Sequence, residues 1–296
     1  MIAALFDAVQ AMLSHDFIAR AFLAGSGIAL AAGLIGYFVV LRSQVFAGDA
    51  LGHAAFTGTT AALVLGVDLR LGLFGATIVF AVAVGSSAGS RWGSRDVAIG
   101  VGFAGVLGFG VLFLSIYTTA GSSANGAAGV SVLFGSIFGL STSQALTAVA
   151  ISAVVVALLL GLGRPLLFAS VDPQVAAARG VPVRVLAITF MVLLGLAVGD
   201  AVQAVGSLLS FGLLVTPAAT AHRLTARPHR ALFLAATISL ADMWVGLTLS
   251  YVFPQLPPSF LILALGFTGY LAALIAAAMR RGRHRASALS VAGAAS

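Results

Sequence analysis

Two side chains that could bind a metal ion stand four residues apart in an otherwise apolar stretch of the chain: Asp49 and His53. On a helix this spacing places both on one face, about one turn apart. At 1.5 Å per residue they would lie roughly 10 and 16 Å beyond Arg42, near the middle of a hydrocarbon core about 30 Å thick. Ionisable residues at such a depth are costly and usually serve a function.

A carboxylate oxygen and an imidazole nitrogen are ligands that zinc, manganese and iron all accept. One helix supplies only two of them, whereas a symmetric dimer of the chain would supply four, enough for a tetrahedral site. The spacing leaves other interpretations open. The pair could hydrogen-bond across a helix interface, Asp49 could cap a helix, or the two residues could form a proton relay or an ion pair with an arginine.

Two further acidic residues lie in or beside apolar segments. Asp242 has no histidine three or four residues away, and it is either a further metal ligand or a hydrogen-bonding group between helices. Asp200 stands at Gly199-Asp200, the only break between two apolar segments, where an aspartate most often caps a helix. The sequence therefore predicts that one helix ends at this dipeptide and that the next begins after it.

The composition shows what kind of protein must position these groups. The chain has 296 residues, of which 60% are hydrophobic and 8% charged, with a mean hydropathy of +1.13. Soluble domains carry about 25% charged residues, so this chain is integral to a membrane and surrounded by lipid. All 15 basic residues are arginine and all eight acidic residues are aspartate, and there is no cysteine.

This inventory excludes several classes of chemistry. Without lysine or cysteine the chain has no Schiff-base lysine, no P-loop lysine, no thiol chemistry and no disulfide. No catalytic motif is present, so we predict a protein that is not an enzyme and binds no cofactor itself. The basic isoelectric point does not indicate nucleic-acid binding, because the arginines lie between apolar segments, where membrane topology explains them.

The apolar segments predict an all-α, polytopic membrane bundle of about eight or nine transmembrane helices in a single domain, residues 17–280. An interfacial leader (1–16) precedes this domain, and an unstructured, arginine-containing cytoplasmic tail (281–296) follows it. A short apolar piece, 130–140, is typical of a re-entrant or surface helix. The nine candidate spans are 18–41, 44–66, 71–90, 97–118, 143–162, 184–199, 204–224, 230–253 and 258–279.

The arginines predict the orientation of the bundle. Thirteen follow odd-numbered spans and only two, Arg20 and Arg70, fall on the other side. Positive charge collects on the cytoplasmic side, so the C-terminus is expected in the cytoplasm. With nine spans the N-terminus would then be outside, and with eight it would be inside.

One predicted cytoplasmic loop, 164–184, carries the signals of a short helix at about 172–181. Asp172 suits the N-cap, Pro173 the first turn, Gln174–Arg179 the helix and Gly180 its C-terminal cap. A short capped helix between two spans is more often a docking element than a passive linker. An ordinary ordered loop is the alternative.

Five stretches stand in order along residues 17–280: VVLRSQVFAGDALGHAAFTG (39–58), DVAIGVGFAGVLGFGVLFLS (96–115), SVLFGSIFGLS (131–141), SVDPQVAAARGVPVR (170–184) and QAVGSLLSFGLLVTPAATAHRL (203–224). Together they resemble the permease subunits of bacterial ABC importers for zinc, manganese or iron. The departures from the family pattern are Gln174 where an acid is common, Gly52 where serine often precedes the histidine, and Ser43-Gln44 after Arg42. None of them removes a candidate ligand.

The resemblance implies a function and partners. It makes Asp49 and His53 metal contacts in a translocation path formed by a homodimer in the bacterial plasma membrane. It implies a separate cytoplasmic ATPase, where ATP would be bound, and an extracytoplasmic metal-binding protein. The cargo it implies is zinc or manganese rather than iron. It also makes 172–181 the helix that couples to the ATPase, through Asp172, Pro173, Gln174, Ala177, Arg179 and Gly180.

Three other functions compete with this interpretation. The first is a permease for siderophores or cobalamin, but such large substrates need a wide path and no ring of Asp and His, so the pair favours a bare ion. The second is a proton-coupled secondary transporter, which would be expected to show two similar halves. The third is a membrane scaffold, which would not need Asp49 and His53 at mid-depth.

Overall fold

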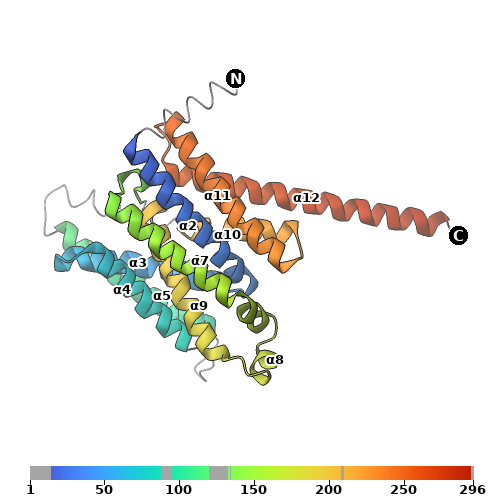
Figure 1. The fold of residues 1–296 in the computed structure, drawn as a ribbon, viewed down its shortest axis with the longest axis horizontal. Helices are drawn as coiled ribbons and strands as arrows, with labels where there is room; N and C mark the ends of the chain where they lie inside the picture. Colours follow the sequence, from blue (N-terminus) through green and yellow to red (C-terminus); the bar gives the residue numbers. More distant parts are fainter. Residues whose placement is uncertain (1–14, 88–94, 120–132, 134, 208–209, 295–296) are drawn as a thin grey trace.

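The structure is a computed structural model that describes residues 15–87, 95–119, 133, 135–207 and 210–294. The greater part of the leader, 1–14, lies outside this range. The described residues form helices and short connections without a strand, which confirms the all-α prediction (Figure 1). The helices are α2 (Asp16–Leu41), α3 (Val45–Leu65), α4 (Leu69–Ser86), α5 (Arg95–Thr119), α7 (Thr142–Val171), α8 (Pro173–Ala178), α9 (Val183–Val205), α10 (Ser210–Leu224), α11 (Pro228–Val252) and α12 (Pro258–Ala294), with a 3-10 turn, η1 (Ile137–Gly139).

Each of the nine predicted spans corresponds to a helix, and seven of these nine helices are long and apolar enough to cross a membrane within the described ranges. The two others are α3 and α10. Helix α3 carries Asp49 and His53 and is less apolar for that reason. Helix α10 has 15 residues, so it is about 22 Å long, which is less than the thickness of the hydrocarbon core.

Two predictions about helix boundaries differ from the structure. The predicted break at Gly199-Asp200 is wrong, because α9 continues through both residues and ends at Val205, before Gly206 with φ 86°. Glycine adopts this left-handed conformation at little cost, so Gly206 ends the helix instead. The sequence predicts an unstructured tail from residue 281, whereas α12 continues to Ala294 in a segment rich in alanine and arginine, both good helix formers.

Helix α2 lies between α7 and α11 at the front of the bundle in Figure 1 and also packs against α10. Two glycines let its neighbours approach closely. A Cβ added to Gly33 would lie 2.6 Å from the Ala235 carbonyl oxygen of α11, and one added to Gly36 would overlap the Leu214 carbonyl of α10. Small residues at helix interfaces permit this close backbone packing in membranes.

Helix connections collect at two ends of the bundle. At one end the ring of His222, in the last turn of α10, stacks on Tyr37 near the end of α2 with 4.7 Å between centroids. The Arg42 guanidinium carbon lies 4.9 Å from the centroid of the Phe190 ring on α9. We call this the arginine-rich end: the C-terminal ends of α2, α7 and α10 and the N-terminal ends of α3, α9 and α11.

The two arginines predicted on the other side lie together near the start of α7. Arg20 donates to Thr142 Oγ1 at 3.1 Å, and Arg70 donates to Ser143 Oγ at 3.4 Å. Part of the predicted re-entrant segment 130–140 lies outside the described residues. What is described of it includes the 3-10 turn η1, whose Ile137 is buried.

Candidate functional site

Helix α3 presents Asp49 and His53 on one face, as their spacing predicts. The Nε2 atom of His53 lies 3.9 Å from Oδ1 of Asp49, and the side chains are 16% and 34% exposed. This separation is too long for a hydrogen bond. The chain turns at residues 42–44, where Ser43 has φ 52°, and α3 begins at Val45. Asp49 and His53 therefore lie about 6 and 12 Å from the start of α3 at Val45. A continuous helix from Arg42 would have placed them roughly 10 and 16 Å from that arginine.

Two of the structural interpretations do not describe this pair. The N-cap of α3 is Gln44, so Asp49 does not cap the helix. Neither Asp49 nor His53 forms a hydrogen bond with another helix in the part of the chain that the structure describes. Both side chains therefore have free ligand atoms.

Aromatic side chains surround the pair. Asp49 opens into a surface groove with Phe46 and Phe211. The Phe103 ring of α5 meets the His53 ring edge to face, with 5.0 Å between centroids, and lies 5.7 Å from the Phe46 ring. Reasoning from the sequence missed these aromatic residues, although Phe103 falls in the stretch 96–115. Phe103 limits the directions in which the imidazole of His53 can turn.

The packing of α3 against the start of α10 depends on Gly52. A Cβ at this position would lie 3.1 Å from Ser210 Oγ and 3.3 Å from the Ser207 carbonyl oxygen. Gly52 is one of the departures from the family pattern, which often has serine there. In this chain the Ser210 side chain occupies the space beside Gly52. The next residue, Phe211, lines the groove at Asp49.

One chain offers two ligands at this site. Within the described ranges, no three His, Asp, Glu or Cys side chains come close enough together to hold an ion. In a tetrahedral zinc site with bonds of about 2.0–2.1 Å, ligand atoms stand roughly 3.3 Å apart. The observed 3.9 Å would close to that value with a small side-chain rotation, but the remaining ligands must come from outside the chain.

The structure does not bring Asp242 to this pair. Asp242 lies in α11, where its Oδ2 atom is buried and has no hydrogen-bond partner among the described residues. A Cβ added to Gly266 of α12 would lie 3.3 Å from this oxygen and 2.5 Å from Thr216 Oγ1 of α10. Asp242 therefore belongs to the contact of α10, α11 and α12.

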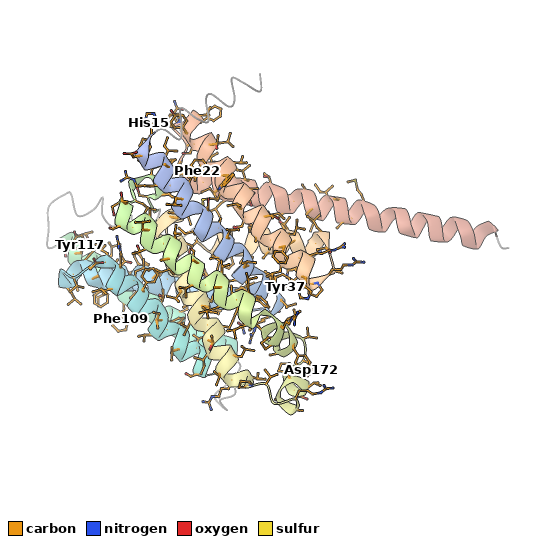
Figure 2. All side chains as sticks on the ribbon, in the orientation of Figure 1. His15, Phe22, Tyr37, Phe109, Tyr117 and Asp172 are labelled. Atoms are coloured by element: carbon orange, nitrogen blue, oxygen red, sulfur yellow. The ribbon has the colours of Figure 1, made fainter. Side chains whose placement is uncertain are left out.

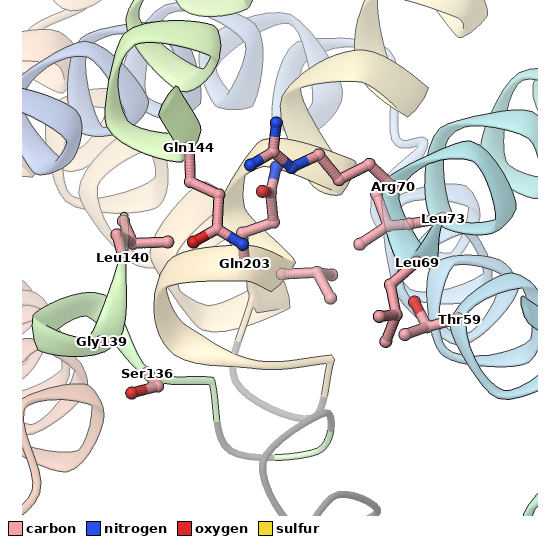
Figure 3. Close-up of a pocket in the computed structure, with 10 residues that line it drawn as sticks. Thr59, Leu69, Arg70, Leu73, Ser136, Gly139, Leu140, Gln144 and Gln203 are labelled. Carbon is pink, nitrogen blue, oxygen red and sulfur yellow. The ribbon is translucent and has the colours of Figure 1, made fainter. Parts of the chain in front are cut away.

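Asp200 links two helices rather than capping one. Its side chain is 1% exposed, and Ser152 of α7 donates a hydrogen bond to its Oδ2 at 2.9 Å. Gln203 donates to its Oδ1 at 3.4 Å. Gln203 also lines a cavity of about 200 Å³ with Gln144 and Arg70 (Figure 3). None of the described residues that line this cavity has a carboxylate, so we do not assign a metal ion to it.

The predicted short helix in the loop 164–184 is present as α8, at the arginine-rich end (Figures 1 and 2). Asp172 Oδ1 accepts hydrogen bonds from the backbone N–H groups of Gln174 and Val175, both at 3.0 Å. Pro173 occupies the first turn, and Gly180, with φ 81°, ends the helix. The Val181 N–H donates to the Ala176 carbonyl at 3.0 Å, which completes a Schellman cap.

The faces of α8 differ in burial. Ala176 is buried against the bundle, whereas Pro173, Gln174, Ala177, Arg179 and Gly180 are exposed. The short helix is therefore fixed at both ends. It exposes these small and polar residues together with the apolar Val175, which is 44% exposed.

Comparisons with known proteins cover nearly the whole chain. The sequence model of the ABC 3 transport family matches residues 14–277. The manganese transport system membrane protein MntC of Listeria innocua is 27% identical over 90% of this chain and 94% of its own. A probable iron transport system membrane protein of Haemophilus influenzae is 27% identical over 89% and 98%. The solved structure of PsaBC from Streptococcus pneumoniae in complex with Fab superposes with a TM-score of 0.77 and 27% identity, over 92% of this chain and 95% of that one.

Proposed function

The chain belongs to the ABC 3 transport family and is a metal-ion permease of an ABC transporter, and we propose that it forms the homodimeric path of a bacterial manganese importer. Because the chain belongs to a family of ABC transporters, it is neither a proton-coupled secondary transporter nor a membrane scaffold. Manganese is favoured because curated relatives that match most of the chain carry that metal's name. The observation that carries the proposal is the pair of free ligand groups, Asp49 and His53, on one face of α3.

Two copies of α3 would complete the site. Each copy contributes one carboxylate and one imidazole, so a two-fold axis beside the groove at Asp49 and Phe211 would gather four ligands around one ion. Two carboxylates supply the negative charge that a dication needs in a low-dielectric path. Separation of the two helices would halve the number of ligands and release the ion.

Helix α8 would transmit the action of a separate ATPase subunit, which binds and hydrolyses ATP. Its caps fix it relative to α7 and α9, so a push on its exposed face would move the ends of both helices. This assignment places the arginine-rich end and the C-terminus in the cytoplasm, as the distribution of arginines predicts. An extracytoplasmic metal-binding protein would deliver the ion at the opposite end, where Arg20 and Arg70 lie.

The test is uptake of radioactive manganese by cells that express the chain with its ATPase and metal-binding protein. The variant Asp49→Asn keeps the size of the side chain and removes its charge. Asp68→Asn is the matched control, because Asp68 caps α4 by accepting from the Arg70 N–H and asparagine caps helices equally well. We expect uptake to fall at least about ten-fold in Asp49→Asn, the effect of one lost charged interaction, and to stay normal in the control.

The same assay identifies the metal. An excess of unlabelled manganese should suppress uptake in the wild type more strongly than equal zinc or iron(II). Normal uptake in Asp49→Asn would contradict the central site. Stronger suppression by zinc or iron would contradict the choice of manganese and leave the site in place.

A further inference from the structure

A groove at the arginine-rich end lies away from the Asp49 site. It is lined by residues of α7 and α11 and by Tyr37 and Phe38 of α2. Figure 1 shows α2 between α7 and α11, and Figure 2 labels Tyr37. The groove has a volume of about 230 Å³. The function proposed above makes no use of it.

The rim of the groove is basic. Arg164 of α7 and His229 of α11 both line it, and no acidic residue does among the side chains that the structure describes. Neither side chain has an ion pair or a hydrogen bond with the described part of the protein. Both are exposed, so two groups that can donate hydrogen bonds to an anion stand free at one opening.

The groove becomes apolar one helical turn further in. Leu160 precedes Arg164 by four residues on α7, and Phe233 follows His229 by four on α11, so each apolar side chain lies on the same face as a basic one. Leu160 is 50% exposed and Phe233 is 59% exposed, and both stand on helices that are long and apolar enough to span a membrane. The groove therefore opens sideways, towards lipid.

The depth of the groove matches the edge of a bilayer. Arg164 comes 22 residues after the start of α7 at Thr142, a distance of roughly 33 Å along the helix, which is about the thickness of the hydrocarbon core. His229 lies in the first turn of α11. The basic rim therefore lies at the level of lipid headgroups, and the apolar part lies at the level of the acyl-chain carbons nearest those headgroups.

We propose that this groove binds one anionic phospholipid, with the phosphate between Arg164 and His229 and the acyl chains along Leu160 and Phe233. The planar guanidinium donates two parallel hydrogen bonds to phosphate oxygens. Basic pockets between transmembrane helices on the cytoplasmic side are suited to anionic headgroups. The proposal requires only that the chain spans the membrane, so it stands or falls separately from metal transport.

Two matched pairs of variants test the groove in the full-length protein. Gly163 lines it and Gly161 does not, and a Cβ at either position meets nothing within 4 Å. Gly163→Leu should therefore fill the groove without disturbing the fold, and Gly161→Leu controls for the same change on α7. Arg164→Gln removes the guanidinium, and Arg184→Gln controls for loss of one exposed charge at the same end.

The first measurement is the phosphatidylglycerol that each purified protein retains in mild detergent, counted by native mass spectrometry. We expect about a ten-fold lower occupancy in Arg164→Gln, the effect of losing a charge-assisted hydrogen bond, and wild-type occupancy in both controls. Gly163→Leu should also lose the bound lipid, because its side chain occupies the groove. Equal loss in Arg184→Gln, or unchanged retention in Gly163→Leu, would overturn the site.

The second measurement is the thermal midpoint of the delipidated protein. Phosphatidylglycerol should raise it more than phosphatidylcholine, and Gly163→Leu should abolish the difference. If inorganic phosphate alone gave the full rise, the ligand would be a free anion and the lipid proposal would be wrong. If Gly163→Leu lost the ATPase subunit while it retained lipid, the groove would instead be a protein contact.

Discussion

Ser152 of α7 and Asp200 of α9 form a hydrogen bond of 2.9 Å between Oγ and Oδ2, and both side chains are 1% exposed. They are the only buried polar pair that joins these two helices through side chains in the described ranges. The bond explains why α9 continues through Asp200, because the carboxylate already has a partner inside the bundle. A buried polar group without a partner would cost free energy.

We expect Ser152→Ala to lower the free energy of unfolding by about 1–3 kcal/mol, since it leaves a buried acceptor without its donor. Ser170→Ala is the control on the same helix, because Ser170 Oγ bonds only to the Leu166 carbonyl of its own helix. The measurement is denaturant unfolding in detergent. Equal losses in the two variants would mean that the contact with Asp200 does not stabilise the bundle.

The crossing of α3 and α4 gives a second stability prediction. A Cβ on Gly72 would overlap the Gly58 carbonyl, whereas a Cβ on Gly75 of the same helix would meet nothing within 4 Å. Gly72→Ala should therefore force the two helices apart and cost about 1–3 kcal/mol. Gly75→Ala should be neutral or slightly stabilising, because alanine favours the helix. Thermal unfolding of both proteins in the same detergent decides this, and a tolerated Gly72→Ala would show that the crossing is not tight.

Local patterns predicted much of this architecture. Apolar runs located the long helices, the four-residue spacing placed Asp49 and His53 on one face, and the cap signals at Asp172 and Gly180 located α8. These features depend on residues close in the sequence. The partner of Asp200 is 48 residues away, so the local pattern indicated a helix end where the tertiary contact keeps the helix intact.

The surroundings of the candidate site could not be predicted in the same way. Phe103 reaches His53 because α5 packs against α3, and nothing in a single sequence specifies which of 20 phenylalanines will do so. The homodimer and the docking role of α8 remain predictions, because they concern surfaces that meet other chains.

The contact of Phe103 with His53 predicts a graded loss of transport. Phe103→Leu keeps an apolar side chain but removes the aromatic edge against the imidazole, a contact worth about 0.5–1.5 kcal/mol. We expect manganese uptake to fall roughly two- to ten-fold. Phe109→Leu is the control, because Phe109 is 60% exposed on the same helix. If both variants transport at the wild-type rate, Phe103 does not orient the imidazole.

We expect the exposed face of α8 to be the surface that the ATPase subunit contacts. Ala177→Trp adds a bulky ring to that face, where it would prevent a partner groove from closing over the helix. The buried Ala176 continues to anchor α8 against the bundle. We expect the variant to insert and fold normally, but to lose the ATPase subunit on co-purification or to uncouple ATP hydrolysis from uptake.

Ala226→Trp separates this surface from its nearest alternative. Ala226 is exposed in the connection between α10 and α11, beside Arg223 and Arg227 at the same end of the bundle. An ATPase that docks on α8 should tolerate this tryptophan, because it lies outside residues 172–181. An ATPase that docks on the arginine-containing connection should be lost from Ala226→Trp and retained by Ala177→Trp. Both variants replace an exposed alanine with tryptophan. The variant that loses the ATPase subunit therefore identifies the surface that this subunit contacts.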